Sequence, residues 1–282
     1  MQTIGVIGAG LMGNGIAHVA AAAGYKVILS DVSSDRTEAA KATIAKNLAR
    51  GLTKGTIDEA TIAAILARIS LTTDTAAFVA ADLVIEAATE NEGVKVKIFA
   101  ELSPKLRPET LLATNTSSIS ITRLAAATDR PDRFTGLHFF NPVPVMALVE
   151  IIRGLRTSEA TVEAVADLAR KLGKTPIGVK NSAGFVVNRI LCPMINEAVF
   201  ALQEGLASAE EIDAGMRLGC NHPIGPLALC DLVGLDVQLA VMEVLYSNFN
   251  DPKYRPAPLL REMVDAGMLG RKTGRGFYTY DK

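Results

Sequence analysis

Acid–base chemistry in this chain is indicated most strongly around His138, one of three histidines in the sequence. The segment GLHFFNPVPVMALVEII, residues 136–152, places His138 among apolar and aromatic residues, and Glu150 is the only acidic residue of the segment. Imidazole titrates near neutral pH, so it can take or give a proton during a reaction. If the two flanking strand patterns pair across the NPVPV turn, Glu150 can orient the ring and stabilise the imidazolium. A core histidine in a structural ion pair would leave the same pattern.

The other histidines and the cysteines offer less. His18 lies in an alanine-rich helical pattern, which favours a packing or surface role. His222 is close to Cys220, but two possible ligands make no convincing metal site. The remaining cysteines, Cys192 and Cys230, lack CxxC spacing, so we expect free thiols, no disulfide framework and no metal.

Two polar clusters interrupt apolar segments. In LLATNTSSISI, residues 111–121, a strand pattern ends in hydroxyl and amide side chains, and Ser117 and Ser118 either cap the next helix or face a ligand crevice. In GFVVNRILCP, Asn188 interrupts a nearly continuous apolar helix, so its amide needs a partner, which could be a substrate oxygen.

A glycine-rich turn near the N-terminus predicts dinucleotide binding. GAGLMG has G-x-G-x-x-G spacing, follows a strand pattern and opens a helical pattern, whose N-terminal N–H groups attract phosphate. The first glycine permits the turn, the second the approach of a pyrophosphate and the third close helix packing. The predicted residues are Gly8, Gly10, Leu11, Met12 and Gly13.

Asp31, after the second strand pattern, is the expected acceptor for a ribose 2′-hydroxyl. Its carboxylate would repel a 2′-phosphate, so NAD is favoured over NADP. Arg36, Ser33 and Ser34 are close enough in sequence to contact a phosphate and leave the preference open.

These residues require a sheet to position them. TIGVIG, a helix ending at Gly24, and YKVILSD form a βαβ unit, which predicts an α/β fold with a Rossmann-type, doubly wound parallel sheet. Residues 34–69 predict an inserted helical hairpin turning at Lys54-Gly55. Further strand patterns, which bring the sheet to about eight strands, are ISLTT, ADLVIEAA, TLLATNT, FTGLHFF, LVEIIRG and TPIGVK, separated by helical patterns around 92–106, 118–126 and 159–172.

The pattern changes near Ala183-Gly184, where we place the boundary between a dinucleotide-binding domain, 1–183, and an all-helical domain, 184–282. Residues 185–205, 208–219 and 226–246 predict helices, and FYTY is the one strand candidate. Apolar residues on more than one helical face suggest a homodimer through this domain: Leu232, Leu235, Val237, Leu239, Val241 and Leu245.

The formal charge of −1 argues against nucleic acid or an anionic membrane as the main partner. The first residues show no charged leader and no apolar run is long enough to span a bilayer, so we expect a cytoplasmic protein.

Across essentially its whole length the sequence resembles the short-chain 3-hydroxyacyl-CoA dehydrogenases. The segments that carry the resemblance are GAGLMGNGIA, EAATENEGVKVKIF, ATNTSSISI, RFTGLHFFNPVPVMALVEII, GFVVNRIL, MRLGCNHPIGPLALCDLVGLD and RKTGRGFY. The combination of HFFNPVPVM, NTSS and GF-x-x-NR is highly specific, whereas the glycine motif alone is not.

The resemblance implies an NAD-dependent oxidoreductase with His138 as acid/base and Glu150 as its orienting partner. It implies that Ser117 and Asn188 contact the substrate near its reacting oxygen, and that the helical domain dimerises. Cofactor contacts carried over are Asp31, Glu90, Lys95, Ser117, Asn141 and Lys272, besides the glycine turn. Lys54 matches a position that contacts CoA phosphates, Arg50 is a plausible helper, and Asn47 stands where some members have a CoA-contacting serine.

The implied substrate is a short-chain acyl-CoA, acetoacetyl-CoA or 3-hydroxybutyryl-CoA. A β-hydroxyacid dehydrogenase acting on a free acid through a lysine is one alternative, against which the NPVPVM segment with His138 and Glu150 argues. A non-catalytic protein, like the lens crystallins that resemble this family, is another. Chain length, direction and pathway stay open among butyrate or crotonate formation, polyester metabolism and fatty-acid oxidation.

Overall fold

The computed structural model describes residues 1–53 and 55–280. The chain divides into two compact units, the first Met1–Ser182 and the second beginning at Ala183, and each is described by itself. No helix within the described residues is long and apolar enough to cross a membrane.

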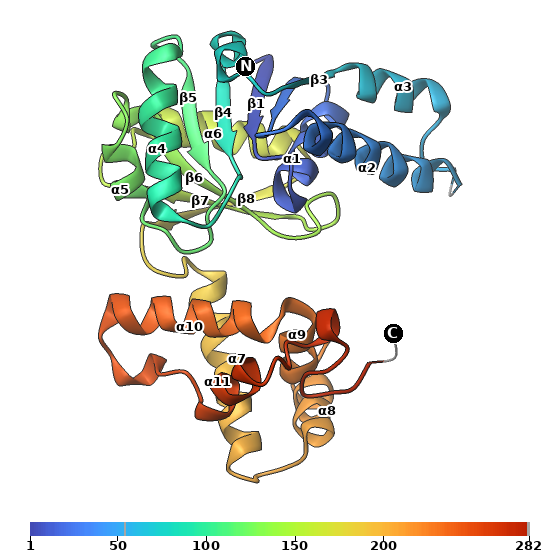
Figure 1. Cartoon of the computed structure of the whole chain (residues 1–282), viewed down its shortest axis with the longest axis vertical. Coiled ribbons are helices and arrows are strands. Elements are labelled where there is room, and N and C mark those ends of the chain that lie inside the picture. The colour runs from blue at the N-terminus through green and yellow to red at the C-terminus, as the bar shows by residue number, and fades with distance from the viewer. Residues whose placement is uncertain (54, 281–282) are drawn as a thin grey trace. The chain divides into compact units, whose positions relative to one another are not determined.

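The first unit is built on one eight-stranded sheet with the order β3-β2-β1-β4-β5-β6-β7-β8 (Figure 1). β1 to β6 run parallel, whereas β7 pairs antiparallel with β6 and parallel with β8. The predicted doubly wound sheet of eight strands is confirmed. The strands are β1 Thr3–Ile7, β2 Lys26–Ser30, β3 Ile69–Thr72, β4 Leu83–Glu86, β5 Leu111–Thr114, β6 Phe134–Phe139, β7 Leu148–Arg153 and β8 Thr175–Lys180.

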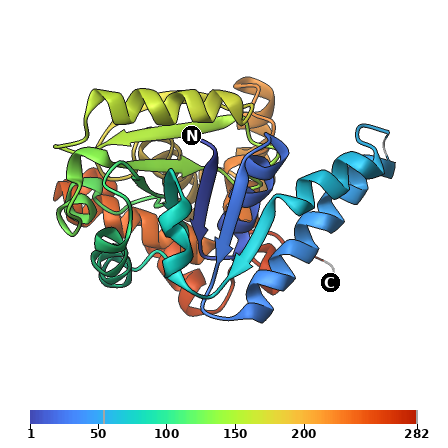
Figure 2. The same ribbon diagram turned by 90° about the horizontal axis from the view of Figure 1, so that it is seen from above.

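Helices cover both faces of the sheet because the strands are apolar on both. One face packs with α1 Leu11–Ala22, α2 Ser34–Thr53 and α6 Glu159–Lys171 in a single core, to which Val6, Leu137 and Leu168 contribute. The other face carries α4 Glu92–Leu102 and α5 Ile121–Ala126, so α4 and α6 lie on opposite sides of the sheet (Figure 2). His138 and Glu150 alternate with the residues of the first core and therefore belong to the second face.

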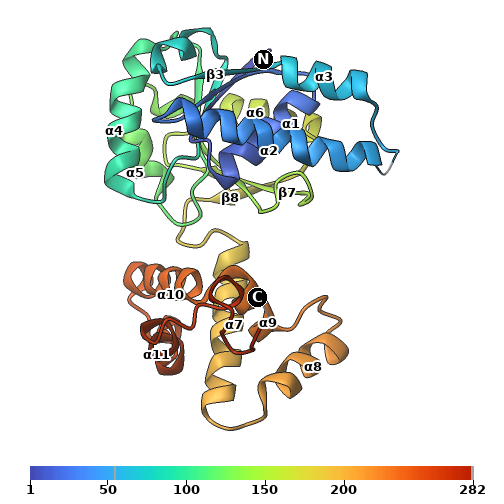
Figure 3. The same ribbon diagram turned by 45° about the vertical axis from the view of Figure 1, so that its right-hand side comes forward.

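The predicted helical hairpin is present as α2 and α3 Glu59–Ala67, which run side by side (Figures 2 and 3). Asp58 caps α3 by accepting a hydrogen bond from the Thr61 N–H at 2.7 Å. The predicted turn residue Lys54 lies outside the described residues.

Short 3₁₀ helices complete the two units. They are η1 Thr75–Ala80, η2 Ser103–Lys105, η3 Pro131–Arg133, η4 Pro252–Tyr254 and η5 Arg271–Thr273.

The second unit is helical, with α7 Val187–Gln203, α8 Ala209–Gly219, α9 Pro226–Val233, α10 Leu235–Phe249 and α11 Pro258–Asp265. The single helix predicted over 226–246 is wrong, because Gly234 at φ +108° separates α9 from α10. The predicted strand FYTY forms only an isolated bridge, between Arg275 and Thr279.

The six apolar residues predicted to form the dimer surface differ in their burial. Leu235, Leu245 and Val241 are buried within their own unit, so their assignment to an intersubunit face is corrected. Leu239 is partly buried against the same core, and Leu232 and Val237 are 53% and 45% exposed. The cysteines of the second unit are free thiols, and burial raises the pKa of Cys192 to about 12, so that it is a packing residue.

Two buried carboxylates hold the C-terminal segment against the helices of the second unit. Asp213 accepts hydrogen bonds from the Leu227 N–H and the Tyr278 hydroxyl, each at 2.8 Å. Asp231 accepts the N–H groups of Phe277 and Tyr278 at 2.9 and 3.0 Å. These bonds satisfy the buried charges with neutral donors and fix the segment that follows η5.

Candidate active site

The predicted pairing of the His138 and Glu150 strands is confirmed. The two residues are direct partners in the antiparallel register of β6 and β7, and His138 Nδ1 lies 2.6 Å from Glu150 Oε2. Glu150 is fully buried and His138 is 7% exposed. A carboxylate at Nδ1 holds the ring hydrogen there, so Nε2 is the basic nitrogen of the neutral ring.

The His138–Glu150 pair lies at the edge of the sheet where a ligand is expected. β6 ends one residue after His138, at the carboxyl edge of the parallel strands, where doubly wound folds bind their ligands. The Phe140 ring lies 4.5 Å from the imidazole, centroid to centroid. Asn115, directly after β5, accepts the Phe139 N–H at 2.9 Å and thereby ties the segment after β5 to the end of β6.

The NTSS segment is organised by Glu90. One oxygen, Oε1, accepts the N–H groups of Ser117 and Ser118 at 2.8 and 3.1 Å and their hydroxyls at 3.0 and 3.1 Å. The Thr116 hydroxyl donates to the same oxygen at 2.7 Å. The alternative that Ser117 or Ser118 caps the next helix is wrong, because Ser120 is the N-cap of α5. The start of α5 at Ile121 therefore makes Ser120, and not the two earlier serines, the capping residue.

The glycine turn has the geometry that its spacing predicts. Gly8 has φ +96°, and a Cβ there would lie 2.5 Å from Ala88 Cα. A Cβ on Gly13 would lie 1.8 Å from the Gly8 carbonyl oxygen, so only glycine lets α1 pack this close to the turn. Around Gly10 a Cβ would meet nothing within 4 Å, and no side chain of the described residues caps α1. The open backbone and uncapped N–H groups fit a pyrophosphate.

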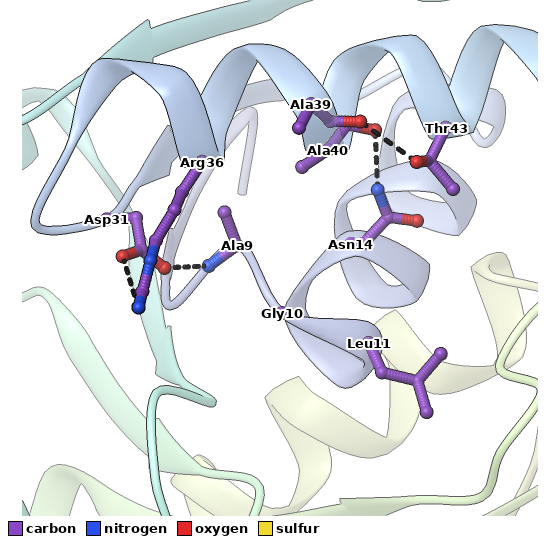
Figure 4. A pocket seen from close by; sticks show the side chains of 9 residues that line it. All are labelled: Ala9, Gly10, Leu11, Asn14, Asp31, Arg36, Ala39, Ala40 and Thr43. Carbon is purple, nitrogen blue, oxygen red and sulfur yellow. Dashed lines mark hydrogen bonds and ion pairs between the residues drawn. The ribbon is translucent and has the colours of Figure 1, made fainter. Parts of the chain in front are cut away.

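Asp31 links the second strand to this turn. Its Oδ2 accepts the Ala9 N–H at 2.7 Å, and its Oδ1 accepts the Val32 N–H at 2.8 Å and faces the Arg36 guanidinium at 3.4 Å (Figure 4). Gly10, Asp31 and Arg36 line a cavity of 470 Å³ between the turn and α2 (Figure 4). A second cavity of 320 Å³ on the Ser30 and Ala88 side also reaches Asp31. The carboxylate therefore stands between two hollows large enough for parts of a nucleoside.

Lys95 lies deeper than a residue expected to contact the cofactor. Its side chain is fully buried, and its ammonium pairs with Glu86 and donates to the Thr114 hydroxyl at 3.1 Å. Glu86 also accepts the Ala88 N–H at 2.8 Å and so holds the segment that lies against Gly8. Sequence reasoning did not single out Glu86, although an acid ending an apolar strand, in DLVIEA, was a usable signal.

The other predicted contacts are spread over both units. Asn141 is an exposed residue of the loop after β6, and Arg50 is exposed in the last turn of α2. Asn188 is half-buried in the first turn of α7, in the second unit. Lys272, also in the second unit, forms an ion pair with Asp236.

An uncapped glycine turn, an acidic residue after the second strand, and a buried histidine–carboxylate pair at one edge of a doubly wound sheet define a dinucleotide-dependent oxidoreductase.

Comparison with known families makes the assignment narrower. The model of the NAD-binding domain of 3-hydroxyacyl-CoA dehydrogenase matches residues 3–182, and that of the C-terminal domain matches residues 184–280. The chain therefore belongs to the 3-hydroxyacyl-CoA dehydrogenase family and is an NAD-dependent dehydrogenase, as its sequence predicted.

Individual relatives are similar to this chain over nearly their full length. The chain is 55% identical to 3-hydroxybutyryl-CoA dehydrogenase of Bradyrhizobium diazoefficiens, covering 99% of this chain and 96% of the relative. It is 50% identical to the enzyme of that name from Clostridioides difficile, with 99% of each covered. The crystal structure of (S)-3-hydroxybutyryl-CoA dehydrogenase from Ralstonia eutropha superposes with a TM-score of 0.98, at 61% identity and full coverage of both chains.

Proposed function

We propose that this enzyme interconverts (S)-3-hydroxybutyryl-CoA and acetoacetyl-CoA with NAD, using His138 as acid/base. The observation that carries the proposal is the buried His138–Glu150 pair at the carboxyl edge of the sheet. The relatives named above, which bear the name of this activity, support the choice of substrate.

Proton transfer belongs to His138. In the oxidising direction Nε2 takes the proton of the 3-hydroxyl while the hydride leaves the same carbon, and in reverse the imidazolium protonates the forming alkoxide. Bound NAD supplies the hydride acceptor. Glu150 stabilises the imidazolium, and its complete burial strengthens that attraction by excluding water.

Substrate positioning is proposed for residues of both units. Ser117 and Asn188 would hydrogen-bond the 3-oxygen, and Arg50, with Lys54, would contact the CoA phosphates. Binding energy from the remote CoA moiety can orient a small acyl group, so the basic hairpin contributes to turnover. Ser117 is already held by Glu90, which limits the positions its hydroxyl can take.

Cofactor contacts are proposed for the glycine turn, Asp31, Glu90, Ser117, Asn141 and Lys272, with Asn141 near the nicotinamide. Asp31, which accepts the Ala9 N–H, favours NAD over NADP because its negative charge would repel the 2′-phosphate of NADP. Lys95 is proposed to contribute to cofactor binding in two ways. One is the predicted direct contact. The other is indirect: its fully buried ammonium pairs with Glu86, which holds the Ala88 segment next to Gly8.

The proposed assembly is a cytoplasmic homodimer formed by the second unit, whose exposed apolar side chains include Leu218, Leu232 and Val237. Such side chains support an interface when they gather on one surface.

The test is consumption of NADH and NADPH with acetoacetyl-CoA and, separately, with free acetoacetate at equal concentration. We expect fast oxidation of NADH with the thioester only. Activity with free acetoacetate alone would favour a β-hydroxyacid dehydrogenase, faster use of NADPH would overturn the role of Asp31, and no turnover at all would favour the non-catalytic alternative.

A further inference from the structure

Lys174, between α6 and β8, is a lysine whose ammonium is buried in the first unit. The residue is 7% exposed, and Nζ donates hydrogen bonds to the backbone carbonyls of Val143 at 2.5 Å and Met146 at 2.8 Å. Burial lowers the pKa of this amine. Lysines are seldom this buried, because their charge is costly to remove from water. The structure therefore keeps a costly cation at this particular point.

Both carbonyls belong to the loop that joins β6 to β7, residues 140–147. This loop already closes on itself, since the N–H groups of Val145 and Met146 donate to the Pro142 carbonyl at 2.9 and 3.0 Å. The Thr175 N–H, next to Lys174, donates to the Ala147 carbonyl at 2.7 Å. The ammonium is thus not needed to form the turn, and what it adds is the position of the turn relative to the rest of the unit.

The loop is fixed on its other side by α1. Val143 is 2% exposed, and a Cβ added to Gly15 of α1 would lie 2.7 Å from its Cβ. α1 begins at the glycine turn, and Asn141 is the second residue of the loop. Lys174 and Gly15 together therefore set the position of Asn141 relative to the pyrophosphate site.

We propose that Lys174 is a positioning residue for the nicotinamide half of the cofactor, acting through the 140–147 loop and Asn141. The inference rests on the proposed function in that it takes Asn141 to face the nicotinamide. Without the ammonium, the carbonyls of Val143 and Met146 lose their donor, and the loop shifts to find water. The glycine turn and Asp31, proposed for the pyrophosphate and the ribose, are joined to each other through the Ala9 N–H and are expected to keep their geometry.

The test separates the two halves of the dinucleotide. Lys174→Met keeps the length of the side chain and removes its donors, and Lys171→Met, an exposed lysine at the end of α6, is the matched control. Dissociation constants are measured for NADH and for ADP-ribose, which lacks the nicotinamide. We expect Lys174→Met to bind NADH about tenfold more weakly and ADP-ribose as the wild type does, whereas Lys171→Met changes neither.

A second variant keeps the test decisive if Lys174→Met fails to fold. Gly15→Ala pushes the loop from the opposite side with Lys174 intact, and the same selective loss of NADH affinity is expected. Equal weakening of both ligands, or of neither, overturns the proposal. If the wild type binds NADH but does not turn over acetoacetyl-CoA, the proposed substrate is wrong, while the ratio of the two dissociation constants still decides the role of Lys174.

Discussion

A single hydrogen bond, between His138 and Glu150, marks the proposed proton-transfer site in an otherwise largely apolar strand pair. The imidazole and the carboxylate come from facing positions in β6 and β7, and both are buried. The Glu150 carboxylate would be unfavourable there without this partner, because an unpaired buried charge is costly. In the proposed mechanism the pair acts as a unit, in which Glu150 holds the ring and stabilises the positive charge that His138 gains during turnover.

Glu150→Gln tests this division of labour. The amide keeps the volume and one acceptor but not the charge, so we expect turnover with acetoacetyl-CoA to fall about 10- to 100-fold, with NADH affinity unchanged. Glu159→Gln, which removes an exposed ion pair with Arg153, is the control and should keep wild-type turnover. Wild-type turnover in Glu150→Gln would make the pair a structural one.

At the scale of elements, the glycine turn between β1 and α1 needs glycine for two different reasons. Gly13 is required by packing, whereas Gly10 faces open space. The two positions can therefore be separated by experiment.

Gly10→Ala should leave the melting temperature near that of the wild type and weaken NADH binding about tenfold, because the added methyl group lies where the pyrophosphate approaches. Gly13→Ala should instead destabilise the first unit by about 3 kcal/mol, since the Gly8 carbonyl must move. Thermal melts and NADH titrations on both variants check this. Undiminished NADH affinity in Gly10→Ala would exclude the turn as the cofactor site.

α1 also carries His18, whose pKa is lowered by burial and then by the charge of Lys174. Its Nδ1 has no hydrogen-bond partner among the described residues. A histidine with a lowered folded-state pKa takes up its proton first in the unfolded state, so stability is present above pH 6.5 and is lost as the pH falls below it.

His18→Phe should remove this dependence. We expect the free energy of unfolding of the wild type to fall by about 1 kcal/mol more than that of the variant between pH 7.5 and 5.5, measured by urea denaturation. An identical pH dependence in both proteins would show that other groups control acid stability.

For the whole molecule, much of the fold could be predicted because the two domains differ in pattern. Strand runs separated by helices predicted the parallel sheet, and the NPVPV turn between two strand patterns predicted the pairing of His138 with Glu150. The errors arise where sequence spacing is ambiguous. Gly234 could sit inside a helix until its φ of +108° showed a break, and Leu235 or Leu245 could face a partner until the unit's own core buried them.

Lys174 was missed for a related reason. A lysine after Gly173, at the end of a helix, is the usual solvent-exposed cation of a helix C-terminus. Its burial depends on the β6–β7 loop, which is distant in sequence and supplies the carbonyls.

The oligomeric state is the prediction that belongs to this scale. Sedimentation equilibrium at micromolar concentration should give about twice the chain mass of 29.8 kDa, and replacing Leu232 and Val237 by glutamate should shift the protein toward monomer. A wild-type monomer would remove the proposed dimer.

The most direct test of the central claim is a single-turnover measurement of NADH oxidation by acetoacetyl-CoA in the wild type and in His138→Gln, with NADH binding measured on the same preparations. The account predicts equal NADH affinity and a rate at least about 100-fold slower in the variant, because glutamine can neither give nor take the proton. A rate near that of the wild type would contradict the assignment of proton transfer to His138.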